Sequence, residues 1–165
     1  MSVPSGAYLE SMALLPSGVS VVTVADGRDD IGATVSAFVS VSADPPIVML
    51  SVAGDGYVAE VVEEVGAFAV SVLAGDLRAI AGRFSAEGRP SARLLVSGEP
   101  HHRGERTRAI VLDRALAALE CSVRRRVEVG DHMVFFADVV GLPEVGSGSP
   151  TPAMVRWNGR YHSVG

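Results

Sequence analysis

Two long β-prone runs flank a turn signal in the last third of the chain, and this arrangement constrains the fold more than any other feature. The turn is centred on Val129, Gly130 and Asp131, and the runs on either side are ALAALECSVRRRVEV and HMVFFADVVGL. Such runs around a glycine-containing turn predict a β-hairpin. A second turn signal, Asn158-Gly159, predicts another hairpin at the C-terminus.

The remaining segments add strands and a few helices. Strands are expected over residues 18–27, 31–42 (with a bend or break), 45–53 and 67–74, and helices over 5–15, 56–66 and 75–88. Gly66 is expected to end the second helix and Asp76 to cap the third. The segment 89–115 has few clear signals, and 146–150 is expected to be a loop. Because strands outnumber helices and β-α-β alternations are few, we predict a mainly β fold. This is a closed or nearly closed antiparallel barrel with peripheral helices, in one domain over residues 1–165.

Composition excludes several classes of function. The formal net charge of −5 argues against nucleic acid as a partner, and the apolar runs are too short to cross a bilayer. All 14 basic residues are arginine, so chemistry that needs a Schiff-base or P-loop lysine is excluded. The N-terminal segment has no basic region before its apolar residues and contains Glu10, so we expect a cytoplasmic protein without a secretory signal. The single cysteine, Cys121, lies in an apolar pattern and is assigned to the core.

Small hydroxyl residues are unusually frequent between residues 31 and 52. In a strand, Thr34, Ser36 and Phe38 share one face, while Val35 and Ala37 share the other. One interpretation is the solvated face of a half-buried strand. The other is a wall of small residues against which a flat heteroaromatic ligand lies. The residues alone leave both interpretations open.

His132 follows Gly130 and Asp131 at the predicted start of a strand. It is either a surface residue of a hairpin turn or a rim residue that contacts a phosphate, a ribose or a nicotinamide. His101 and His102 lie in a polar segment, where we expect them to be solvated. No carboxylate or cysteine stands at metal-ligand spacing from them, so no metal site is predicted.

Taken in order, these segments resemble the flavin reductase family, the small proteins that supply reduced flavin to two-component monooxygenases. The resemblance rests on six stretches that together span most of the chain: PSGVSVVTV, GATVSAFVSVSADPPIVMLSV, GAFAVSVLAGDLRAIAGRF, LAALECSV, GDHMVFFADV and PAMVRWNGRY. It implies a six-stranded antiparallel split barrel that binds FMN, or FAD in some members. It also implies a homodimer, hydride transfer from NADH or NADPH to the flavin, and a flavin-dependent monooxygenase as partner.

The resemblance also implies roles for individual residues. The flavin contacts would be made by Thr34, Val35, Ser36, Ala37, Ser51, Val52 and Ala53. His132 would lie near the nicotinamide or the flavin.

One segment departs from the family pattern. Where the family usually carries basic or hydroxyl residues that bind the flavin phosphate, this chain has Gly54-Asp55-Gly56-Tyr57. Retention of flavin is then expected to be weak, unless the phosphate is bound by Arg83, by Arg89 or by a helix N-terminus starting near Gly56.

Two other functions remain open at this point. One is a non-catalytic flavin- or haem-binding split-barrel protein. The other is an oxidase resembling pyridoxamine phosphate oxidase, which the lack of lysine disfavours.

Overall fold

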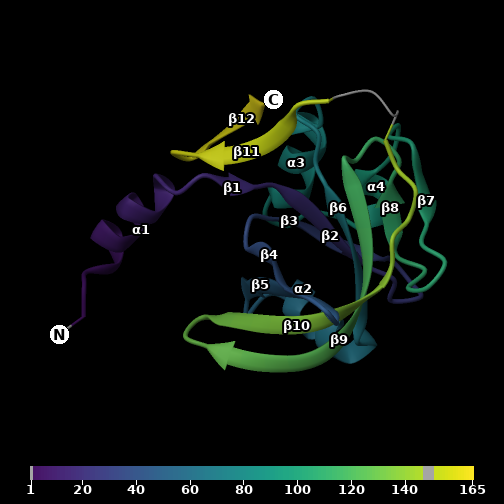
Figure 1. Ribbon diagram of the computed structural model, residues 1–165, viewed down its shortest axis with the longest axis horizontal. Coiled ribbons are helices and arrows are strands. Elements are labelled where there is room, and N and C mark those ends of the chain that lie inside the picture. The colour runs from purple at the N-terminus through teal and green to yellow at the C-terminus, as the bar shows by residue number, and fades with distance from the viewer. Residues whose placement is uncertain (1, 147–150) are drawn as a thin grey trace.

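The computed structural model describes residues 2–146 and 151–165. Its largest element is an antiparallel sheet of seven strands that curls on itself (Figure 1). Across the sheet the strands are β3 (Ile31–Val35), β2 (Ser20–Val24), β6 (Ala67–Val72), β9 (Ala117–Val129), β10 (His132–Gly141), β5 (Pro46–Ala53) and β4 (Phe38–Ala43). The predicted class, a mainly β antiparallel split barrel, is confirmed. The main sheet has seven strands rather than six, because the run 31–42 is divided into two.

The division of that run explains why the sheet is curled. β3 and β4 are the two edge strands of the sheet, yet only Ser36 and Ala37 separate them along the chain. Such a link spans about 11 Å at most, so the two edges must approach each other. The backbone N–H of Ser51 donates to the carbonyl of Ala37 over 2.9 Å, which fixes the link against β5. The predicted break is therefore the place where the barrel closes.

Each face of the sheet packs against its own apolar core. β2 shows this alternation: Val22 and Val24 face one core, while Val21 faces the other. The first core lies inside the curled sheet and is completed by α2 (Tyr57–Val65). The second lies on the outer face beneath α3 (Arg78–Ser85), and both cores contain fully buried phenylalanines. Cys121 is buried in the first core, as predicted.

The two predicted hairpin turns and the predicted glycine end of the second helix are present. Gly130 adopts φ 59° between β9 and β10, and Gly66 adopts φ 72° at the end of α2. Asn158 and Gly159, at φ 48° and 73°, join β11 (Ala153–Trp157) to β12 (Arg160–Val164). This C-terminal hairpin pairs with β1 (Ser17–Gly18) in a separate three-stranded sheet.

One prediction about the middle of the chain was wrong. Asp76 does not cap α3: the helix begins after Leu77 without a side-chain cap, and the Asp76 carboxylate pairs with Arg114 instead. The segment 89–115, which has few clear sequence signals, is mostly loop and contains α4 (Ala92–Leu95), β7 (His101–Arg103) and β8 (Ile110–Leu112). These elements have only three or four residues each, too few to give a periodic pattern.

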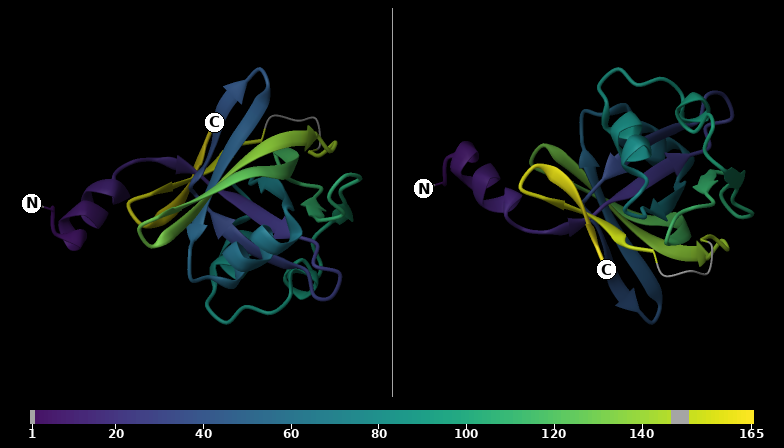
Figure 2. Two further views of the ribbon diagram at one scale, coloured as in Figure 1. Left: turned by 90° about the horizontal axis from the view of Figure 1, so that it is seen from below. Right: turned by 90° about the horizontal axis from the view of Figure 1, so that it is seen from above.

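The N-terminal helix α1 (Ser5–Ala13) projects from the body of the molecule (Figures 1 and 2) and buries none of its side chains. Of the predicted loop 146–150, all but the first residue lie outside the described residues. None of the helices in the described ranges has the length and apolar content needed to span a membrane.

Candidate functional site

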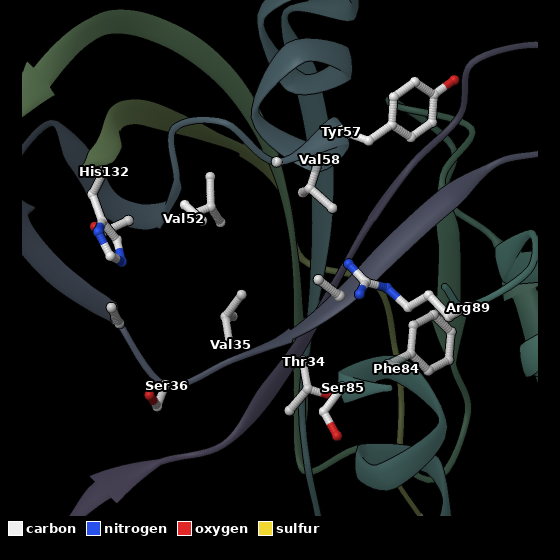
Figure 3. A pocket seen from close by; sticks show the side chains of 15 residues that line it. Thr34, Val35, Ser36, Val52, Tyr57, Val58, Phe84, Ser85, Arg89 and His132 are labelled. Carbon is white, nitrogen blue, oxygen red and sulfur yellow. The ribbon is translucent and has the colours of Figure 1, made fainter. Parts of the chain in front are cut away.

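A pocket of about 340 Å³ lies where the two edges of the sheet approach each other (Figure 3). Its walls are the β3–β4 link, the end of β5, the first turn of α2, the end of α3 and the start of β10. Its lining residues are Ala33, Thr34, Val35, Ser36, Ala37, Ser51, Val52, Ala53, Gly56, Tyr57, Val58, Phe84, Ser85, Arg89 and His132.

Nine of the ten residues expected at the site line this pocket. They come from four separate segments of the chain: Thr34, Val35, Ser36 and Ala37; Ser51, Val52 and Ala53; Arg89; and His132. Arg83 is the exception, because it does not line the pocket. Its guanidinium donates to the carbonyls of Leu95 and Ser97, which joins α3 to the segment after α4.

Strand pairing brings His132 to the wall of the pocket. The first residue of β10, His132, pairs with the last residue of β5, Ala53, and Val134 pairs with Ser51. The turn after β9 therefore fixes the position of the histidine relative to the β5 wall. The side chain of His132 is 48% exposed, and its Nδ1 lies 2.8 Å from Oδ1 of Asp131. This hydrogen bond lowers the pKa of the Asp131 carboxyl. With Nδ1 engaged by Asp131, Nε2 is the ring nitrogen left to contact a ligand.

The small hydroxyl residues between residues 31 and 52 do not share one role. The hydroxyl of Thr34 donates to the carbonyl of Ala81 over 2.7 Å, so it joins β3 to α3 instead of facing a ligand. Ser36 and Ser51 are half-buried and lie on the pocket wall. The prediction of a wall of small residues fits these two serines and Ala37 better than it fits Thr34.

Arg89 places a positive charge at the end of the pocket opposite His132 (Figure 3). Its Nε donates to the carbonyl of Gly32 over 2.7 Å, and Nη1 donates to the carbonyl of Ala86 over 3.2 Å. Burial lowers the pKa of Arg89 from its ordinary value, but a guanidinium remains charged at neutral pH. The two backbone contacts hold the group in place before any ligand arrives.

The first turn of α2 forms the adjacent part of this end of the pocket. Gly56 is the N-cap residue and the helix has no side-chain cap, so Asp55 does not occupy the first N–H groups of the helix. Gly56, Tyr57 and Val58 all line the pocket. A helix N-terminus carries partial positive charge and unpaired N–H donors, which favour an anion. The start of α2 near Gly56 was anticipated from the sequence.

Phe84, Ser85 and Val58 are among the wall residues that were not assigned to the site from the sequence. Phe84 is fully buried in the second core and also lines the pocket. Ser85 and Val58 carry no signal that distinguishes them from ordinary helix residues. They reach the pocket because α3 and α2 lie against β3.

The chemistry of the pocket is that of a binding site for a flat ring with an anionic tail. Its middle is lined by Val35, Val52 and Val58, and its two ends carry His132 and Arg89. In the described part of the chain, no cluster of His, Cys, Asp and Glu has the arrangement of a metal site. These residues fit a flavin mononucleotide: small and apolar groups against the ring, and a guanidinium with a helix N-terminus for the phosphate.

Comparison with known proteins agrees with this geometry. The family described as Flavin reductase like domain matches residues 12–165. The chain belongs to the flavin reductase family. The match covers all the strands of the main sheet and every wall of the pocket.

Similar members of the family include two curated proteins and one solved structure. The NADH-dependent FMN reductase AsuE2 of Streptomyces nodosus subsp. asukaensis is 34% identical over 95% of this chain and 83% of its own length. The reductase component of 4-hydroxyphenylacetate 3-monooxygenase of Thermus thermophilus is 34% identical over 96% of this chain and 95% of its own. The crystal structure of BorF, the flavin reductase component of a bacterial two-component tryptophan halogenase, superposes with a TM-score of 0.88 at 30% identity. That superposition covers 98% of each chain.

Proposed function

We propose that this flavin reductase family member oxidises NADH, passes the hydride to FMN or FAD, and supplies the reduced flavin to a partner flavin-dependent monooxygenase. The observation that carries the proposal is the pocket at the barrel closure, apolar in its middle, with His132 at one end and Arg89 at the other. The named relatives support NADH as the reductant and a monooxygenase or halogenase as the consumer of reduced flavin.

In this proposal each wall of the pocket has a separate task. The β3–β4 link and the end of β5 hold the flavin ring, since Ser36, Ala37 and Ser51 leave room and offer polar groups at its edge. Arg89 and the start of α2 bind the phosphate. His132 contacts the nicotinamide nucleotide from the opposite end. A bound flavin supplies the hydride acceptor, and the protein holds the two reactants in contact.

The first test is catalytic turnover. The purified protein is mixed with NADH and FMN, FAD or riboflavin, and NADH oxidation is followed by absorbance. A reductase oxidises many equivalents of NADH per protein molecule. Oxidation of no more than one equivalent would contradict the proposal and favour a non-catalytic flavin carrier.

The second test concerns His132. His132→Ala should raise the Michaelis constant for NADH, or lower the rate of hydride transfer, by about tenfold, as expected for one lost contact of about 1.4 kcal/mol. Because the side chain is half exposed, the melting temperature should stay close to that of the parent. His101→Ala, at an exposed histidine outside the pocket, is the matched control. Unchanged kinetics in His132→Ala would show that His132 is only a surface residue of the hairpin turn.

The protein is also proposed to act as a homodimer. α1 exposes Tyr8, Leu9 and Met12 although a nine-residue helix is marginally stable in water without packing. The edge strand β4 exposes Val39 and Val41 and carries no charged residue that would block pairing. In the proposed homodimer, the apolar residues of α1 and β4 are covered by apolar residues of the second copy.

Light scattering after size exclusion tests the dimer. The expected species has twice the 17.1 kDa mass of the chain. Combined Leu9→Glu and Met12→Glu substitutions should shift the protein toward the monomer, while Leu94→Glu, at an exposed leucine elsewhere, should not. A parent that is monomeric at micromolar concentration would refute the dimer.

A further inference from the structure

Tyr57 occupies an unusual position for a large aromatic residue. It is the first residue of α2, it lines the pocket, and it is 60% exposed. Among the hydrogen bonds of the described residues none involves its hydroxyl, and the ring belongs to neither core. Figure 3 shows the ring on the same side of the pocket as Arg89, with its hydroxyl pointing away from the other labelled side chains. The face of the ring is therefore available to a ligand that extends out of the pocket.

The groups beside Tyr57 indicate which part of a ligand would reach it. Arg89 and the uncapped start of α2 lie at the same end of the pocket, opposite His132 (Figure 3). Both favour phosphate oxygens. A group attached beyond the phosphate of a bound nucleotide would next meet the ring of Tyr57.

The size of the pocket also indicates where the adenylate of a dinucleotide would lie. A volume of about 340 Å³ is near the lower end of the range for small-molecule sites. It suits the flavin ring and its ribityl phosphate, but an adenine dinucleotide contains an additional adenylate that must lie outside the enclosed space. An exposed aromatic ring is suited to stack with a purine in such a position.

From these observations we infer that Tyr57 is a stacking platform for the adenine ring of an adenine dinucleotide bound in the pocket. This inference rests on the proposed function of the pocket as a flavin and nicotinamide site. The shared chemistry is an adenylate linked through phosphate to the reacting ring. Its two possible sources are FAD and NADH, and the arms of the experiment separate them.

The first arm measures flavin binding without turnover. FAD and FMN are titrated against the parent, Tyr57→Ala and Tyr57→Phe by flavin fluorescence. If the adenylate comes from FAD, Tyr57→Ala should weaken FAD binding about tenfold and FMN binding less than twofold, because one base stack is lost. Tyr57→Phe keeps the aromatic face and should retain the affinity of the parent.

The second arm measures the reductant. If the adenylate comes from NADH, Tyr57→Ala should raise the Michaelis constant for NADH about tenfold, while the constant for reduced nicotinamide mononucleotide stays unchanged. Val65→Ala, at an exposed residue on the last turn of the same helix, is the control for general effects on α2. Melting temperatures of all variants show whether the fold is retained.

The inference is overturned if Tyr57→Ala changes neither the FAD-to-FMN ratio nor the ratio between the two reductants. It is also overturned if FMN and FAD weaken equally, since the pocket itself would then be perturbed, or if Tyr57→Phe loses as much as Tyr57→Ala. Failure of the proposed function looks different: the parent would then bind no flavin and oxidise no NADH.

Discussion

Arg89 carries the positive charge at one end of the pocket, and contacts with backbone carbonyls hold it there. Its Nε and Nη1 donate to the carbonyls of Gly32 and Ala86, so two parts of the fold hold the guanidinium in position. A charged donor fixed before binding loses little conformational entropy when a phosphate arrives. In the proposed function, this side chain supplies the cation that the segment from Gly54 to Tyr57 lacks.

This role predicts how Arg89→Met changes flavin selectivity. A hydrogen bond to a charged group contributes about 1.5–3 kcal/mol, so the variant should bind FMN about ten- to a hundredfold more weakly, with riboflavin affinity nearly unchanged. The FMN preference of the parent should also decrease at high salt. Flavin-fluorescence titrations with both ligands measure these affinities. Arg83→Met is the matched control, since Arg83 lies outside the pocket and its loss should leave the FMN-to-riboflavin ratio unchanged. Equal ratios in the parent and Arg89→Met would refute the assignment.

At the level of residues, the family resemblance named nine residues that line the pocket but not the partner of each side chain. Arg83 and Arg89 have the same chemistry and lie six positions apart, so nothing in the sequence distinguishes the pocket residue from the structural one. The difference arises because α3 ends at Ser85, after which the chain turns back over β3. The bond from Thr34 to Ala81 joins residues 47 positions apart and has no local signature either.

At the level of elements, local signals predicted the parts of the chain that local physics decides. The hairpin turns, the glycine end of α2 and the break in the run 31–42 all follow from residues adjacent in sequence. Asp76 was assigned to a cap because its side chain suits one, but Arg114, 38 positions away, takes the carboxylate. α4 and β8 pack in the second core, β7 pairs with β8, and all three elements are too short to be predicted from a pattern.

The contact between α3 and β3 leaves no room for a side chain at Gly32. A Cβ at Gly32 would lie 2.6 Å from Cε1 of Phe84 and 2.9 Å from the carbonyl oxygen of Val22. Gly32→Ala should therefore force α3 away from β3, lower the free energy of unfolding by about 1–3 kcal/mol, and weaken FMN binding by displacing the carbonyl that holds Arg89.

Chemical denaturation and FMN titration of the same samples measure both effects. Gly82→Ala is the control, because a Cβ at position 82 would meet no atom within 4 Å. The substitution also replaces a glycine on the exposed side of α3 with a better helix former. It should stabilise the protein by about 0.5–1 kcal/mol. A Gly32→Ala variant as stable as the parent would show that α3 adjusts without cost.

At the level of the whole molecule, the sequence predicted a barrel but not how it closes. The two edge strands are consecutive in the chain, and a link of two residues forces the sheet to curl and creates the pocket between its edges. The count of strands and their order across the sheet depend on long-range pairing, for which a single sequence gives no register. The function follows from this closure, since it brings β3 and the β3–β4 link together with the end of β5 and the start of β10 around one pocket.

Asp30 connects distant segments on the side of the molecule where α4 and β7 lie. Its side chain is 1% exposed and accepts from Arg93 on α4 and from Arg103 on β7, while its backbone carbonyl accepts from the N–H of Ala92. Burial by itself raises the pKa of Asp30, but the hydrogen bonds from Arg103 and Arg93 outweigh it and hold the pKa below the ordinary value.

Because the pKa of Asp30 is lower in the folded state, its contribution to the free energy of unfolding depends on pH. A carboxyl whose pKa is lower in the folded state stabilises the fold fully above its unfolded pKa of about 3.9, and the contribution is lost as pH falls through the folded value. Asp30→Asn should therefore reduce the free energy of unfolding by about 2 kcal/mol at pH 7, because a charged acceptor of two arginines is lost. The difference between variant and parent should shrink as pH falls below about 4, where the carboxyl of the unfolded chain begins to protonate, and it should be lost as pH falls through the lower pKa of the folded state. Urea unfolding at a series of pH values measures it, with Asp29→Asn as the control at the adjacent exposed aspartate. A deficit in Asp30→Asn that stays constant from pH 7 to pH 3 would mean that the contribution of Asp30 lies in its shape and packing, and that its charge does not hold these segments together.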